Sequence, residues 1–314
     1  MSGGGTATFG ALLLAIVGWG LSHVATRYLL LDRVRAFDVV ILRYSIASCL
    51  FVPVLFRLPR AAWRRAELGS MAACGLLGVA GFSVPVTLGT QSVPAGTAGL
   101  LVTTESMWIS LISVAVLGER LGWGLPVGLL LASGGVVALA GGPGTVGLVP
   151  GGAARGAGLV LLGAFSWAVY AVAVRPYTRK YGSAASTGLT LMLGTIPLLA
   201  GWTPGLAERS THIGGGAWGA LLFLGGVASV FSTVFWNYGS ARTSSARAGP
   251  WLYLIPLVSV LGGHLLLGEP IRPTTVLGGA LIVAGVGITQ LHPRGRGAEA
   301  VGPGEGDDRP AGDA

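Results

Sequence analysis

Long apolar runs separated by short polar breaks follow one another along the chain from residue 8 to residue 291. Each run is close to the roughly 20 mostly apolar residues that a helix needs to cross a bilayer. The runs are too long, and alternate too little, for the strands of a membrane barrel, so helices are the predicted structure. We expect an all-α membrane protein with ten transmembrane helices, at about residues 8–29, 37–56, 69–89, 94–117, 122–141, 156–175, 184–202, 215–239, 246–267 and 273–291.

Composition favours the same class of protein. Apolar residues make up 52% of the chain and charged residues 10%, well below the roughly 25% charged residues of a soluble domain. Nucleic-acid binding would need a basic patch on a water-facing surface, and such surface is scarce in this chain. We therefore expect the lipid bilayer as a partner and no nucleic acid.

Arginine and lysine are distributed unequally between the two sides of the predicted membrane protein. If the N-terminus is inside, the inner segments carry thirteen of these residues. The outer loops then carry five, namely Arg33, Arg35, Arg155, Arg209 and Arg272. The positive-inside rule thus predicts a multi-pass protein of the cytoplasmic membrane with both termini in the cytoplasm. Residues 292–314 are rich in Gly, Pro and charge, which predicts a disordered cytoplasmic tail.

The two halves of the chain repeat each other. A shift of 150 residues aligns "LGE" at 117–119 with "LGE" at 267–269, and a shift of 148 aligns Trp19 and Arg27 with Trp167 and Arg175. Chance matching among Gly/Ala/Leu-rich helices is the alternative, but Trp, Arg and the Gly-Glu pair recur in register at the ends of the runs. Residues 8–141 and 156–291 are therefore predicted repeats of five helices. Because five is odd, the second repeat enters the membrane inverted, as in many secondary transporters.

Several motifs resemble one family of membrane proteins. They are "GWG" with a basic residue eight positions beyond its Trp, "LRYSIA" in the second run, and "LGERL" and "LGEP" at the ends of the fourth and ninth. With the ten runs, these resemble EamA-type permeases of the drug/metabolite transporter superfamily. The resemblance implies the ten-helix fold and transport of small metabolites, which are chemically diverse in that superfamily. Ser106 stands where many relatives have a proline, so no proline break is expected in the fourth helix, whereas Pro256 keeps the proline in the second half.

The sequence offers no machinery for hydrolysing ATP or for catalysis. A phosphate-binding loop of the type G-x-x-x-x-G-K-[ST] needs a lysine followed by Ser or Thr, and the only lysine, Lys180, precedes Tyr181. Histidines are scattered, and we expect no cofactor, no metal site and no enzymatic activity. The interpretation is a secondary transporter that moves a small organic solute by alternating access, through proton coupling or exchange, with export favoured by the resemblance. The alternatives are a polytopic membrane enzyme, a lipid-handling subunit, or a membrane subunit driven by a separate ATPase.

Glu105 lies near the middle of the apolar run "GLLVTTESMWISLISVAVL". An ionised carboxylate at that depth costs roughly 2–4 kcal/mol on insertion scales, so it usually faces a partner or a water-filled cavity. Two functional readings follow: Glu105 binds a cationic or hydrogen-bonding group of the solute, or it carries the coupling proton. The alternative is a permanent pair with Arg43, in the outer third of the second run.

Other candidates for a solute pocket are aromatic or polar residues within the runs. Helical spacing places Trp108 beside Glu105, and Trp19 on one face with His23 and Arg27. The full set of predicted pocket residues is Glu105, Trp108, Trp19, His23, Asn237, Trp167 and Tyr170. An aromatic pocket with one carboxylate suits an amphipathic solute, including an amine held by cation–π contact. Packing or interfacial anchoring is the alternative for the aromatic residues, and hydrogen bonding across helices is the alternative for His23 and Asn237.

Charges repeated at the ends of the runs suggest two gates. Arg27 and Glu269 fall near the predicted outer face, and Arg175 and Glu119 near the inner face. Each pair could close its own side while the other opens, and exchanging the charges of Arg27 and Glu269 should then restore transport lost in either single reversal. The alternative is that these residues meet headgroups and loop backbone. Small residues in the runs at 122–141 and 273–291 allow close helix contact, including a homodimer.

Overall fold

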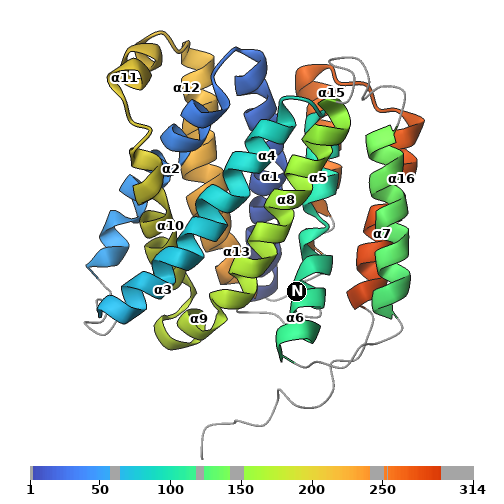
Figure 1. Ribbon diagram of the computed structural model, residues 1–314, viewed down its shortest axis with the longest axis horizontal. Coiled ribbons are helices and arrows are strands. Elements are labelled where there is room, and N and C mark those ends of the chain that lie inside the picture. The colour runs from blue at the N-terminus through green and yellow to red at the C-terminus, as the bar shows by residue number, and fades with distance from the viewer. Residues whose placement is uncertain are drawn as a thin grey trace, which may run out of the picture.

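The computed structural model describes residues 3–56, 64–117, 124–141, 152–240, 251–252 and 254–290. Every secondary-structure element assigned within these ranges is a helix (Figure 1). The first half contains α1 (Gly3–Leu31), α2 (Ala36–Leu55), α3 (Arg65–Gly75), the π-helical segment η2 (Leu76–Gly81), α4 (Phe82–Thr90), α5 (Ala95–Val102), α6 (Glu105–Leu117) and α7 (Gly124–Gly141). The second half contains α8 (Gly152–Ala173), α9 (Arg175–Tyr181), α10 (Ser183–Leu199), α11 (Pro204–Thr211), α12 (Gly215–Leu222), the π-helical segment η3 (Phe223–Phe231), α13 (Ser232–Ser240), α15 (Leu254–Leu267) and α16 (Pro273–Gln290).

Within the described residues, each of the ten predicted runs contains a helix or a chain of consecutive helices, and residues 122–123, 246–250, 253 and 291 of these runs lie outside the described part. The third run is α3, η2 and α4 in succession, and the eighth is α12, η3 and α13, whereas the fourth is divided into α5 and α6. In the described part of the chain, five helices are long and apolar enough to cross a membrane, or six if the pair α10 and α11, bent by 102°, is one span. Shorter apolar helices include α15 and most of α16. The protein is thus a multi-pass helical membrane protein, and the number ten stays a prediction.

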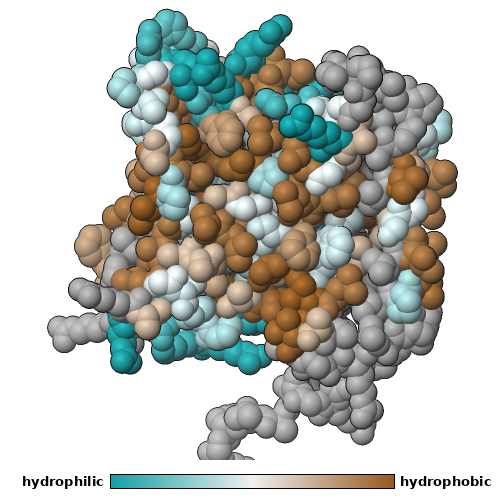
Figure 2. All heavy atoms as spheres, in the orientation of Figure 1, coloured by the Kyte–Doolittle hydropathy of each residue, from teal (hydrophilic) through white to brown (hydrophobic). Residues whose placement is uncertain are grey.

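The surface of the helix bundle is apolar between two polar ends. The long helices run up and down the bundle, and α1 begins at the same end at which α16 finishes (Figure 1). On the face shown in Figure 2, hydrophobic residues form a broad middle zone, and hydrophilic residues gather above and below it. Large apolar side chains such as Leu14, Leu130 and Leu265 are exposed. Such a zone fits the hydrocarbon of a bilayer, which solvates exposed apolar side chains.

Packing between helices is reciprocal in the two halves. The first helix, α1, packs against α13 and α15, and its counterpart α8 packs against α4 and α6. Likewise η3 packs against α2, while α3 and η2 pack against α10. Two further extensive helix–helix contacts, α2 with α10 and α7 with α16, join counterpart helices of the two halves to each other. The packing therefore follows the same shift of about 150 residues that relates the sequences.

Two glycines let α3 and α10 approach through their backbones. A Cβ atom added to Gly194 would collide with the carbonyl of Gly75, and one added to Gly75 would collide with the carbonyl of Thr190. The corresponding contact in the other half involves Gly225, whose added Cβ would lie 2.7 Å from the Cβ of Ile46. One half thus has glycine on both helices at this crossing, and the other has glycine on one.

The small residues of α7 and α16 pack these two helices against each other. An added Cβ on Gly135 would lie 2.6 Å from the carbonyl oxygen of Gly278, and one on Gly285 would lie 2.6 Å from that of Gly128. These faces are therefore occupied within a single chain. The homodimer stays a prediction, and any such contact would have to use other faces of α7 and α16.

We expect Gly194→Ala to destabilise the protein, because the added methyl group overpacks the α3–α10 crossing at a cost of about 1–3 kcal/mol. The matched control is Gly158→Ala, at an exposed position of α8 with no atom within 4 Å of the added Cβ. Thermal unfolding of the purified proteins in detergent measures the difference. Equal unfolding temperatures for the two variants would contradict the close backbone contact.

Candidate functional site

A break in the fourth apolar run places Glu105 at the start of a helix. The hydroxyl of Thr103 donates to the carbonyl of Leu100 at 2.6 Å, and that of Thr104 donates to Leu101 at 2.7 Å. These bonds satisfy carbonyls at the end of α5, and α6 begins at Glu105. The missing proline at position 106 thus does not prevent a break. Helix α15 likewise begins at Leu254, the position equivalent to Thr104 under the 150-residue shift.

Glu105 is half-buried and has no charged partner in the described chain. The predicted alternative, a permanent pair with Arg43, is not formed. Arg43 instead donates from Nε to the hydroxyl of Ser229 in η3 at 3.0 Å, and its guanidinium lies 5.3 Å from the ring centroid of Tyr44. The carboxylate of Glu105 is therefore available for a proton or a solute, and its position in the first turn of α6 suits a negative charge.

Three predicted aromatic residues lie along α6 and α8. The ring of Trp108 makes an edge contact with Phe165 at 5.5 Å, and the indole nitrogen of Trp108 is buried without a hydrogen-bond partner. Trp167 contacts Phe82 at 5.1 Å and Tyr170 at 5.0 Å. The packing of α6 against α8 therefore brings Glu105, Trp108 and this aromatic row to the same part of the bundle.

The remaining pocket candidates lie on α1 and α13. Trp19 packs on Trp236 with ring centroids 5.6 Å apart. His23 is buried, and a Cβ added to Gly99 of α5 would lie 3.4 Å from its ring. Asn237 belongs to α13, but its side chain lies outside the described residues. The structure thus divides the candidates into an α6–α8 group and an α1–α13 group.

Two cavities have been identified in the described chain, and neither is lined by Glu105. The larger, of about 240 Å³, is an apolar groove on α1, η3 and α15 whose lining includes Tyr28, Phe223 and Leu266. The smaller, of about 20 Å³, lies beside Pro94 and Glu269. No cluster of three or more His, Cys, Asp or Glu side chains suited to a metal occurs in the part of the chain that the structure describes.

The predicted outer pair, Arg27 and Glu269, is formed. Arg27 Nε lies 3.3 Å from Glu269 Oε1, and both side chains are largely buried. Arg27 Nη1 also donates to the carbonyls of Thr90 and Gln91, at 2.8 and 2.9 Å, and so caps the end of α4. Glu269 Oε2 accepts from the Ala95 N–H at 2.9 Å and so caps the start of α5. Burial raises the pKa of Glu269, which lies in the turn after α15, while the Ala95 N–H and Arg27 act in the opposite direction.

Both interpretations of these charges therefore apply. Arg27 and Glu269 form an ion pair between the two halves, and each also makes hydrogen bonds with the backbone next to a helix end. This geometry also changes what exchange of the charges can show. A glutamate at position 27 could not donate to the carbonyls, and an arginine at position 269 could not accept from the Ala95 N–H. We therefore no longer expect the exchange to restore transport, whether or not the pair is a gate.

The predicted inner pair lies partly outside the described residues. Arg175 begins α9, but Glu119 is not among the residues that the structure describes. At this end an exposed pair that sequence reasoning missed joins α9 to α3: Lys180 Nζ lies 2.6 Å from Glu67 Oε1. It joins the two halves, as the Arg27–Glu269 pair does at the other end.

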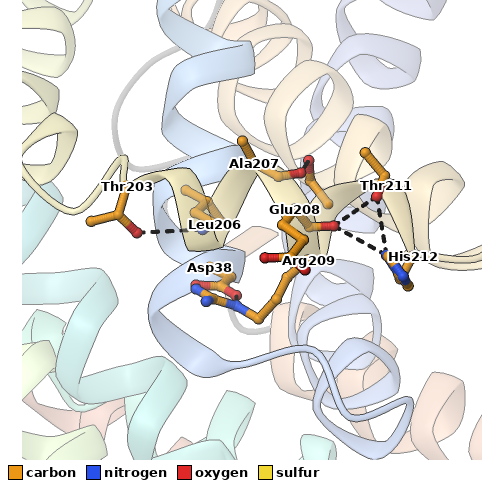
Figure 3. A network of polar contacts seen from close by, with 9 residues as sticks. Asp38, Thr203, Leu206, Ala207, Glu208, Arg209, Thr211 and His212 are labelled. Carbon is orange, nitrogen blue, oxygen red and sulfur yellow. Dashed lines mark hydrogen bonds and ion pairs between the residues drawn. The ribbon is translucent and has the colours of Figure 1, made fainter.

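A second ion pair, at the end that the sequence predicts to be outside, was also missed. Arg209 donates from Nε and Nη2 to the two carboxylate oxygens of Asp38, at 2.7 and 2.8 Å, and so ties α11 to the first turn of α2 (Figure 3). Thr203 caps α11 by accepting from the Leu206 N–H at 3.3 Å. Asp38, an acid at the start of an apolar run, was the signal that the sequence offered for this pair. Its partner could not be predicted, because only the 102° bend before α11 brings Arg209 to Asp38.

Comparison with known proteins decides the family. A model of the EamA-like transporter family matches the chain twice, over residues 7–141 and 154–290. The chain belongs to the EamA-like transporter family. It is therefore a membrane transporter, and the two matches correspond closely to the two halves described above.

Individual relatives agree with the family. The chain is 32% identical to a "probable terminal-alkyne amino-acid exporter" of Streptantibioticus cattleyicolor, over 94% of this chain and 97% of the relative. It is 28% identical to an uncharacterized transporter of Archaeoglobus fulgidus, over 88% and 96%, and 25% identical to a "probable amino-acid metabolite efflux pump" of Escherichia coli, over 92% and 97%. A solved crystal structure matches with a TM-score of 0.59 at 22% identity, over 91% of this chain and 97% of that chain, which shows a shared fold.

We expect Glu269→Ala to lower the free energy of unfolding by about 1–3 kcal/mol, because the Ala95 N–H loses its acceptor and Arg27 loses its counter-ion. Glu67→Ala is the control, since the exposed pair with Lys180 contributes little. Thermal unfolding in detergent provides the comparison. Equal losses in the two variants would mean that Glu269 does not fasten the outer ends of the helices.

Proposed function

We propose that this EamA-family protein is a secondary transporter of the cytoplasmic membrane that exports a small organic solute by alternating access, with Glu105 carrying the coupling proton. The observation that carries the proposal is the position of Glu105, a carboxylate inside an apolar run, at a helix break and without a charged partner in the described chain. A permanently ionised carboxylate there is costly. A carboxylate that alternately binds and releases a proton avoids that cost in its neutral form.

The neighbours of Glu105 leave the carboxylate without a competing charge. Helix α6 packs against α8, α7 and α16. Within the described residues of these three helices, the only charged or titratable side chains are Arg155 and Tyr170, which lie near opposite ends of α8. Protonation of Glu105 therefore removes the one acidic charge of this part of the bundle. This supports a role in coupling over a role in a structural ion pair.

Alternating access is supported by the organisation of the two halves. We take residues 8–141 and 156–291 as inverted repeats that rock against each other, with both termini in the cytoplasm. On this topology the Arg27–Glu269 and Asp38–Arg209 pairs lie at the outer face, where they fasten helices of the two halves together. The conformation described here is then closed on the outside.

Amino acids are the first solutes to test. Two relatives are named for export of a terminal-alkyne amino acid and for efflux of amino-acid metabolites. The aromatic row of Phe82, Trp167 and Tyr170 beside α6 would suit a solute with an apolar side chain.

We expect Glu105→Gln to lose transport driven by a pH gradient while it keeps solute exchange at zero gradient. The carboxamide retains the size of the side chain but cannot release a proton. The measurement is uptake of labelled amino acids by proteoliposomes with and without an imposed gradient. The gradient-driven rate should fall roughly tenfold or more, and exchange should stay within about twofold, since only the protonation step is removed.

The matched control is Glu208→Gln, which changes an exposed acid on α11. It should behave as the wild type in both assays. If Glu105→Gln responds to the gradient as the wild type does, Glu105 has a structural role and another group carries the proton. If the wild type moves no solute from a broad panel, the transport proposal for small organic solutes is wrong.

A further inference from the structure

We propose that Arg43 of α2, together with His23 of α1, binds the carboxylate of the transported solute. This inference rests on the proposed function, because it assigns a part of the solute to a site on the transport pathway. It departs from the sequence-based interpretation, in which Arg43 was only a partner for Glu105. The site takes an organic carboxylate, such as the α-carboxylate of an amino acid.

The charge of Arg43 has no acidic partner in the described structure. The residue lies well inside α2, within an apolar run, and it is half-buried. The three ion pairs of the described residues are those of Arg27, Lys180 and Arg209, so none of them includes Arg43. A cation in such a place is costly unless it faces an anion or a water-filled space.

The helices around α2 carry no acidic residue that could neutralise Arg43. Those packed against α2 include α1, α4, α10, α12 and η3, whose described residues contain no Asp and no Glu, and α11, whose one acid, Glu208, is exposed. The one acid of α2 itself is Asp38, in the first turn of the helix, and both of its oxygens are bound by Arg209. The electrostatic field at this site therefore favours an anion from outside the chain.

One hydrogen bond holds the guanidinium, and no described residue accepts from its terminal nitrogens. Nε of Arg43 donates to the Ser229 hydroxyl at 3.0 Å, and that hydroxyl donates its own proton to the Leu224 carbonyl at 2.9 Å across the π-helical segment η3. No described residue accepts from Nη1 or Nη2, and neither atom is among the buried polar atoms that lack a partner. The two terminal nitrogens present the parallel donors that a carboxylate accepts.

His23 adds a second polar group to the same site. It is buried on α1, which packs against η3 and contacts α2, the two elements that hold Arg43 and Ser229. An imidazole N–H beside an arginine can supply a further donor to an anion. Glu105 is not part of this site, because α6 packs chiefly against α8 whereas α2 packs against α10 and η3.

The experiment compares acids with their amides, which differ in the charge of one group. Probes are L-propargylglycine and L-phenylalanine with their amides, and the variants are Arg43→Gln, Arg43→Lys and Ser229→Ala. Binding is read from the shift in thermal unfolding temperature of detergent-purified protein, and transport from exchange in proteoliposomes. The matched control is Arg155→Gln, which removes an exposed arginine of α8.

We expect the wild type to prefer each acid over its amide, and Arg43→Gln to abolish the preference. The half-saturating concentration of the acid should rise roughly tenfold to hundredfold, the range for a lost charge-assisted hydrogen bond, while that of the amide stays nearly constant. Arg43→Lys should retain part of the preference, because lysine keeps the positive charge but lacks the parallel N–H donors of the guanidinium. Ser229→Ala, which removes the contact of Nε, should weaken acid binding by less than Arg43→Gln does.

The two readouts separate the site from the transport function. Binding of acids that depends on Arg43, without exchange, would support the site and contradict the transport proposal. Exchange of acids that survives in Arg43→Gln would support transport and overturn the site. Equal losses for acid and amide in Arg43→Gln, or a wild type that no acid stabilises, would also overturn the site.

Discussion

The absence of water inside a bilayer is the constraint on which this structure depends. Every polar group in the hydrocarbon region has to find its partner within the chain. Many buried hydroxyls obey this rule by bonding to backbone carbonyls, as Thr195 does with Leu191 at 2.7 Å and Ser259 does with Gly20 at 2.9 Å. Against this background, a charged side chain without a counter-charge is informative. Glu105 and Arg43 are such exceptions among the described residues, and the functional proposals depend on them.

The duplicated architecture solves the same packing problem twice with different residues. At the crossing of α1 with α13, Gly18 faces the hydroxyl of Ser232. At the counterpart crossing of α8 with η2, the roles are exchanged, since Ser166 faces Gly81 and donates to the Leu77 carbonyl at 3.0 Å. One small residue and one hydroxyl fit each crossing, whichever helix carries which. Residue identity therefore diverges between the repeats while the geometry of the contact is kept.

Local patterns predicted the helices and the outer charge pair, whereas tertiary geometry decided the rest. The limits of α1 and α2 followed from the apolar runs, and Arg27 was placed beside Glu269 because both fall at the same end. The predicted depth of Arg43 in the membrane did not indicate which helix it faces. The packing of α2 against η3 places Ser229 within hydrogen-bond distance of Arg43. The helix break before Glu105 was missed because a proline was the expected cause, and neighbouring threonine hydroxyls bond the freed carbonyls instead.

Helix α5 connects the outer ion pair to the carboxylate in the membrane. Its first N–H is bound by Glu269, and it ends at Val102, three residues before Glu105, where α6 begins. All eight of its residues are buried, and a helix of that length spans about 12 Å. A buried, packed element of this kind moves as a unit, because packed cores do not deform continuously. On the proposed topology, a shift of α5 that separates Ala95 from Glu269 would therefore be transmitted toward the segment that begins at Glu105.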